Sequence, residues 1–153
     1  MIFILISFGV PLLLYFFLPS VLQIATGKSP VSKIWLVIAC LLFIVSWYLP
    51  SPEIRGQQTA FVTHFVGGGL FSGALWLYIR KFLRLDQNPI YDLLAIYFLV
   101  SALGVANELF EFVTVEIGYA RLNPSDTWWD LLANTSGAVV FWMAYSIYKI
   151  FNK

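Results

Sequence analysis

The sequence predicts an all-α protein: a polytopic membrane helical bundle of five transmembrane helices, forming one integral membrane domain over residues 1–153. Two observations predict this fold. The chain is 60% hydrophobic and only 11% charged, and its mean hydropathy of +0.82 lies far outside the usual mix of soluble domains. Apolar runs with few charges also recur along it, near the roughly 20 residues that a helix needs to cross a bilayer.

The first expected span covers Met1 to Ala25 and contains Pro11 and Pro19, each of which removes a helical hydrogen bond. No basic segment precedes its apolar core. Because a cleaved signal peptide normally begins with such a segment, we expect this span to be a retained helix.

Four further spans and one loop complete the expected bundle. Gly118 and Pro124 interrupt helices, so the segment from Ile117 to Ser125 is expected to be a loop. The further spans are Ile34 to Leu49, Thr59 to Ile79, a fourth from Ile90 through Asn107 into an acidic stretch, and Trp128 to Ile150.

Basic residues alternate between successive connections, and this alternation predicts the orientation. Only Arg55 and Arg121 lie on the connections after the second and fourth spans. Because cytoplasmic loops are enriched in Lys and Arg, the N-terminus is expected outside and the C-terminus in the cytoplasm. The basic residues on the cytoplasmic connections are Lys28, Lys33, Arg80, Lys81, Arg84, Lys149 and Lys153.

The charge argues against nucleic-acid binding, and the cysteine count excludes an intramolecular disulfide. A net charge of +1 with scattered Lys and Arg provides no basic surface for nucleic acid, so membrane lipids are the expected surroundings and no nucleic-acid partner is expected. The single cysteine, Cys40, lies in an apolar run and allows no intramolecular disulfide. We expect it to be a small core residue.

Acidic residues concentrate in one part of this apolar chain, where five of the eight lie between Glu108 and Asp130. An ionised side chain at the centre of a membrane helix costs about 2.5 to 3.5 kcal/mol on insertion scales, so several close together must be paired or used. This concentration predicts a candidate catalytic or binding site toward the external face. Its expected residues are His64, Glu108, Glu111, Arg121, Asp126, Asp130 and Asn134.

Two polar columns are expected to meet at this site, because a short connection makes consecutive antiparallel helices neighbours. The first column lies on one flank of the fourth span, at residues three and four apart: Asn107, Glu108 and Glu111. The second recurs every four residues over the first turns of the fifth span: Asp126, Asp130 and Asn134.

Arg121 and His64 are the expected partners of these acids. Arg121, in the loop between the columns, is suited to pair with a carboxylate or to hold a phosphate or carboxylate of a ligand. His64 lies near the same end of the third span. Further along that span, Gly69 and Gly73 form a small-xxx-small pair that lets a helix of this chain, or of a second copy in an oligomer, approach closely.

Four positions also have ordinary explanations. Thr127 and Asp130 have the spacing of a capping box, which satisfies free amides at a helix start. Glu116, at the loop edge, is expected to be solvated. Asp92 is expected to cap the fourth span or to face the basic loop before it.

The pattern resembles the VanZ-like membrane proteins over about residues 59 to 145, and the YjdF-like inner-membrane proteins show a similar pattern. The first parts are His64-Phe65 before the glycines, and Asn107-Glu108 with Glu111, where VanZ-like proteins usually have Gln and the YjdF-like pattern is closer. Arg121 and the stretch from Asp126 through Asp130, Asn134 and Gly137, of the form D-x-x-x-N-x-x-G-A, complete it. The resemblance implies a multi-pass protein of the bacterial inner membrane, linked in one subgroup to resistance to the glycopeptide teicoplanin.

The residues leave three functions open. The first is an enzyme acting on a lipid-linked or amphiphilic substrate, with His64 as general base, Arg121 binding a phosphate, and a divalent metal ion as cofactor. The acids expected to hold that ion are Glu108, Glu111, Asp126 and Asp130. The second is a protein that binds or transports a ligand, although the cytoplasmic halves of the spans offer little polar beyond Ser101 and Asp92. The third is a structural, partner-docking protein whose ion pairs fix helix register.

Overall fold

The computed structural model describes residues 2–54, 56–118 and 126–151. This part of the chain is mostly helical, as the sequence predicts. A two-stranded antiparallel hairpin, β1 (Glu53–Ile54) with β2 (Gln57–Gln58), occupies the connection after the second expected span. The helices are α1 (Ile2–Thr26), α2 (Ile34–Ser46), α3 (Phe61–His64), the π-helical segment η1 (Phe65–Leu70), α4 (Phe71–Leu83), α5 (Pro89–Glu116) and α6 (Asp126–Phe151).

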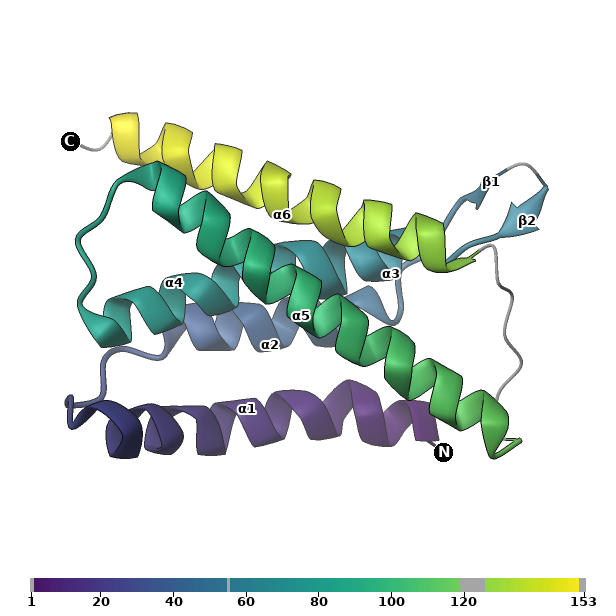
Figure 1. Cartoon of the computed structure of the whole chain (residues 1–153), viewed down its shortest axis with the longest axis horizontal. Coiled ribbons are helices and arrows are strands. Elements are labelled where there is room, and N and C mark those ends of the chain that lie inside the picture. The colour runs from purple at the N-terminus through teal and green to yellow at the C-terminus, as the bar shows by residue number, and fades with distance from the viewer. Residues whose placement is uncertain (1, 55, 119–125, 152–153) are drawn as a thin grey trace.

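Successive long helices run antiparallel between two ends of the bundle, and α5 crosses its neighbours obliquely (Figure 1). The end at which α1 begins, and at which the strands lie, is called the hairpin end. The end at which α4 and α6 finish is called the basic end, because Arg80, Lys81 and Lys149 lie there. The continuous helix α3–η1–α4 is central, since it contacts α2, α5 and α6, whereas α1 packs on α2.

Three described helices are long and apolar enough to cross a membrane: Leu5–Thr26, Phe61–Leu83 and Pro89–Glu116. At 13 residues α2 is apolar but only about 20 Å long, which is less than the hydrocarbon core of a bilayer. The 26 residues of α6 suffice in length, but polar residues occupy its first turns. Five spans, with the N-terminus outside, therefore stay a prediction.

The ends of α2 and α5 follow from their local sequences. The expected span to Leu49 is helical only to Ser46, because a tighter turn follows in which Trp47, Tyr48 and Leu49 donate to carbonyls three residues earlier. Pro50 then disfavours helical backbone at the residue before it. At the start of α5, the side chain of Asn88 accepts a hydrogen bond from the Ile90 amide at 3.0 Å, and Pro89 occupies the first position.

The lysine just before α2 compensates for a proline in α1, which runs as one helix through both of its prolines. Pro19 has no N–H, so the carbonyl of Tyr15 lacks its usual donor. Lys33 donates to that oxygen at 3.4 Å, and its ammonium lies 4.3 Å from the centre of the Tyr15 ring. The start of α2 is thereby tied to the middle of α1.

Glycines allow η1 and α6 to pack backbone against backbone. A Cβ on Gly69 would lie 2.6 Å from the Asn134 carbonyl oxygen and from Gly137 Cα, and a Cβ on Gly137 would overlap the Phe65 carbonyl. One turn later, a Cβ on Gly73 would overlap the ring of Phe141. The close approach predicted for Gly69 and Gly73 thus occurs inside the chain, and an oligomer through this face stays a prediction.

We expect Gly69→Ala to lower the free energy of unfolding by about 1 to 3 kcal/mol, because the added methyl meets backbone atoms that cannot turn aside. Gly9→Ala is the matched control. Position 9 lies inside α1 with no described atom within 4 Å of a Cβ, so alanine should be neutral or slightly stabilising there. Thermal unfolding in one detergent measures both, and equal melting temperatures would contradict the packing.

The predicted orientation is tested with single cysteines at two positions, one on the connection after the second expected span and one at the end of the sequence. In a Cys40→Ser background, Arg55→Cys should react with an impermeant maleimide in intact cells, and Lys153→Cys should react only after lysis. The reverse pattern would place the hairpin end in the cytoplasm.

Candidate functional site

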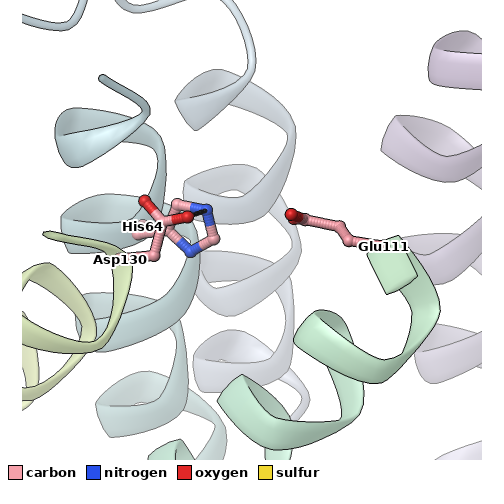
Figure 2. Close-up of side chains that lie close together, drawn as sticks. All are labelled: His64, Glu111 and Asp130. Atoms are coloured by element: carbon pink, nitrogen blue, oxygen red, sulfur yellow. Dashed lines mark ion pairs between the residues drawn. The ribbon is translucent and has the colours of Figure 1, made fainter. Parts of the chain in front are cut away.

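Three side chains from three helices converge near the hairpin end. His64 ends α3, Glu111 lies near the end of α5, and Asp130 lies in the second turn of α6. The Nε2 atom of His64 lies 3.3 Å from Oδ2 of Asp130, and one ligand atom from each of the three residues lies within 4.8 Å of the other two. Figure 2 shows His64 and Asp130 side by side, with Glu111 pointing toward them from α5. We call this set the His64–Glu111–Asp130 group.

The group is largely withdrawn from the surface. The side chain of Asp130 is 2% exposed and that of His64 is 13% exposed. A carboxylate buried to this degree is stable only beside a cation or hydrogen-bond donors, which the imidazole of His64 supplies. The predicted meeting of the α5 and α6 columns is confirmed for Glu111 and Asp130.

Neighbouring polar residues hold the carboxylates of Glu108 and Glu111. Asn107 donates from Nδ2 to Oε1 of Glu111 at 2.6 Å, across the one helical turn that separates them. Thr127 donates from its hydroxyl to Oε2 of Glu108 at 2.9 Å, which joins α6 to α5. Glu108 is therefore hydrogen-bonded to Thr127. Among the described residues, the side chains that converge with Asp130 are those of His64 and Glu111.

Asn134 lies one turn deeper than Asp130 and is 5% exposed. Its amide fits against backbone, because a Cβ on Gly68 would overlap Oδ1 and a Cβ on Gly104 would lie 3.3 Å from Nδ2. No described group hydrogen-bonds to that Oδ1 atom, which is buried. Asn134 thus lies one turn of α6 further into the bundle than Asp130, packed against Gly68 and Gly104.

Two of the predicted site residues, or their side chains, lie outside the described residues. Arg121 falls in 119–125, outside the described residues, and Asp126 begins α6 with its side chain also outside them. Their expected roles as phosphate-binding and metal-binding residues stay predictions. Glu116 ends α5 as an exposed residue, as expected.

Comparison with known families adds one finding. The chain matches, over residues 9–150, the family described as "Predicted membrane protein (DUF2238)". The chain belongs to this family. Comparisons with curated proteins and with solved structures give no match. Because the match covers nearly the whole chain, it supports a membrane location for this protein.

The DUF2238 protein has a second buried polar cluster, at the basic end. Arg80 lies 3.1 Å from Asp92, and these side chains are 8% and 1% exposed. Asp92 also accepts from the indole of Trp76 and from the amide of Gln87, both at 3.0 Å, and Arg80 donates to the hydroxyl of Tyr145 at 2.9 Å. Asp92 faces a basic residue, as expected, but its deep burial and its bond from Trp76 give no periodic signal in the sequence.

One face of α5 connects the two clusters. Its buried residues recur every four positions: Asp92, Ile96, Val100 and Gly104. Ile96 and Val100 belong to an apolar cluster with Ala138, onto which Trp76 and Trp142 pack. Apolar packing therefore separates the His64–Glu111–Asp130 group from the Arg80–Asp92 pair.

The group can act as a metal site or as an ion-pair network. Imidazole nitrogen and carboxylate oxygen are ligands for zinc and other divalent transition metals. Three protein ligands leave a coordination position for water or a ligand atom, as in catalytic zinc sites. A protonated His64 between two carboxylates is the structural alternative.

We expect Asp92→Asn to lower the free energy of unfolding of the DUF2238 protein by about 3 to 5 kcal/mol, because the charge of buried Arg80 would lose its counter-ion. Asp86→Asn, at an exposed position without an ion pair to any described residue, is the control and should change it by less than about 0.5 kcal/mol. Chemical unfolding in detergent measures both. The combined Arg80→Met and Asp92→Leu change should recover part of the loss, and no recovery would contradict the pairing.

Proposed function

We propose that the chain binds a divalent metal ion between His64, Glu111 and Asp130 and uses it to hold, or act on, the polar head of an amphiphilic ligand. The observation that carries the proposal is the convergence of three ligand atoms, from three separate helices, within 4.8 Å of one another. Such a convergence needs the whole bundle to be folded, which distinguishes it from acids that cluster only in sequence.

The distances suit a small ion. Ligand atoms about 2.1 Å from a tetrahedral ion lie about 3.4 Å apart, and His64 Nε2 is already 3.3 Å from Asp130 Oδ2. Glu111 would need to move inward by at most about 1.4 Å, within reach of a side-chain rotation. Asn107, which donates to Oε1 of Glu111, would orient the carboxylate toward the metal.

The site's position favours an amphiphilic ligand. The group lies near the end of a bundle whose outer surface is apolar, with Leu109, Phe112 and Val113 exposed on α5 around Glu111. A ligand with a lipid part would rest on that surface while its polar head reaches the metal. Lewis-acid assistance to a reaction at that head is the enzymatic form of the proposal.

Two other functions account for less of the arrangement. A proton or ion conduit needs polar groups along its whole length, whereas Ile96 and Val100 fill the space on α5 between the polar clusters. A structural network explains the His64–Asp130 pair but does not require the carboxylate of Glu111 to point at the same spot.

The finer assignment to VanZ-like or YjdF-like proteins of the bacterial inner membrane rests on the resemblance alone. Residues of the proposed metal site, His64, Glu111 and Asp130, are among those that carry it. A cell-envelope or glycopeptide-type ligand is the form of the proposal that this resemblance suggests.

Metal analysis of detergent-purified protein tests the site. We expect about one zinc, manganese or iron ion per chain, and loss of that ion in His64→Ala, Glu111→Gln and Asp130→Asn. Glu116→Gln is the matched control, since this exposed acid lies on the same helix outside the group, and it should keep the ion. A chelator should lower the melting temperature of wild type by several degrees and leave Asp130→Asn unchanged, because only the protein that binds the ion gains its stabilisation.

An ion-pair network gives the opposite result. No metal would purify with the chain, a chelator would not change its melting temperature, and each single substitution would destabilise it because a buried charge loses its partner. That result would rule out the metal site.

A further inference from the structure

The basic end carries a hollow that the proposed metal site does not use. It has a volume of about 300 Å³, at the lower limit of small-molecule sites, and lies between the end of α4, the connection to α5 and the last turns of α6. Its charged and polar lining residues are Arg80, Lys81, Arg84, Asp86, Tyr145 and Lys149.

Three cations of this lining have no counter-ion among the described residues: Lys81, Arg84 and Lys149. The fourth, Arg80, is neutralised by Asp92 and forms a fixed wall, because it also donates to the Tyr145 hydroxyl and to the Gln87 carbonyl. With Asp86 as the one carboxylate of the lining, three cations against one anion leave the hollow with a net charge of +2.

Capping of α4 does not account for these cations. The amide of Arg84 donates to the Lys81 carbonyl at 3.1 Å, and that of Leu85 donates to the Arg80 carbonyl at 3.1 Å, which is the pattern of a Schellman cap. Lys28 donates to the Leu83 carbonyl from the other side. The carbonyls of Arg80, Lys81 and Leu83 thus have donors other than the side chains of Lys81, Arg84 and Lys149.

Arg84 occupies a backbone position that normally belongs to glycine. Its φ of 54° makes it the one described residue other than glycine with positive φ. An arginine there is strained relative to glycine, and such strain points to a role for the side chain. The side chain lines the hollow.

Tyr145 and Lys149 complete a set of donors one turn apart on α6. The Tyr145 hydroxyl accepts from Arg80, so its own proton is directed elsewhere. The ammonium of Lys149 lies 5.9 Å from the centre of the Tyr145 ring, a cation–π contact that holds it beside the hollow.

We propose that this hollow binds a phosphate group, held by Lys81, Arg84 and Lys149 with the Tyr145 hydroxyl as a further donor. Guanidinium and ammonium groups beside a fixed hydroxyl match the oxygen atoms of a phosphate. The phosphate comes from an anionic lipid head or from a soluble phosphate ester. Basic pockets between membrane helices bind anionic lipid heads.

Binding of two probes to purified protein in a neutral detergent distinguishes the sources. Phosphatidylglycerol, with phosphatidylcholine as reference, represents the lipid, and glycerol 3-phosphate represents the soluble ester. We expect one of the two to be retained at one molecule per chain in native mass spectrometry. Arg84→Gly and Lys149→Gln should each weaken its binding about fivefold.

Lys33→Gln is the matched control for charge, because it removes one positive charge at the same end outside the hollow. This change also removes the contact with the Tyr15 carbonyl, so its melting temperature is measured beside its affinity. Lys33→Gln should leave the affinity unchanged. Without ligand, Arg84→Gly should melt at the wild-type temperature or above, since glycine relieves the strain, so weaker binding cannot come from misfolding. Equal weakening by Lys33→Gln would indicate general attraction to a basic surface, and absence of binding by both probes would show that there is no site; either result overturns the proposal.

Discussion

Burying an ionised side chain in an apolar bundle costs free energy unless a partner lies beside it, and the association of the helices depends on two such pairings. His64 and Asp130 join α3 to α6 near one end, and Arg80 and Asp92 join α4 to α5 at the other. Each pair joins two helices that are separate elements of the bundle, at one defined position on each. Apolar clusters pack between these polar contacts.

Between the two pairs, glycines and branched apolar residues pack the helices in different places. Gly69 and Gly137 bring the backbones of η1 and α6 together, whereas Ile96 and Val100 fill the space between α5 and its neighbours. The two ends of the bundle consequently differ in chemistry: one gathers acids around an imidazole, and the other gathers cations around a hollow. The apolar middle keeps the two chemistries apart.

Much of this arrangement follows from sequence patterns because spacing fixes which side chains share a helix face. The spacing of Glu108 and Glu111, and of Asp130 and Asn134, predicts two columns, and Glu111 and Asp130 do meet. Spacing does not reveal which column His64 joins, because that depends on how α3 is rotated about its axis. Spacing also gives no signal for Trp76 and Tyr145. The indole of Trp76 donates to Asp92 and the hydroxyl of Tyr145 accepts from Arg80 only once distant helices have packed together. The sequence predicts too long a second helix, because apolar residues continue past the end of α2 into a tighter turn.

The π-helical segment η1 determines where the imidazole of His64 points. In an α-helix, residues five apart lie on different sides, but the bonds of a π-helix join residues five apart and align them. His64 and Gly69 are five apart, and both face α6. An ordinary α-helix over the same residues would turn His64 by about 140° from the glycine face, whereas residues four apart in an α-helix share a face. The π-helical segment therefore accommodates one extra residue and still keeps the imidazole of His64 on the side of Asp130.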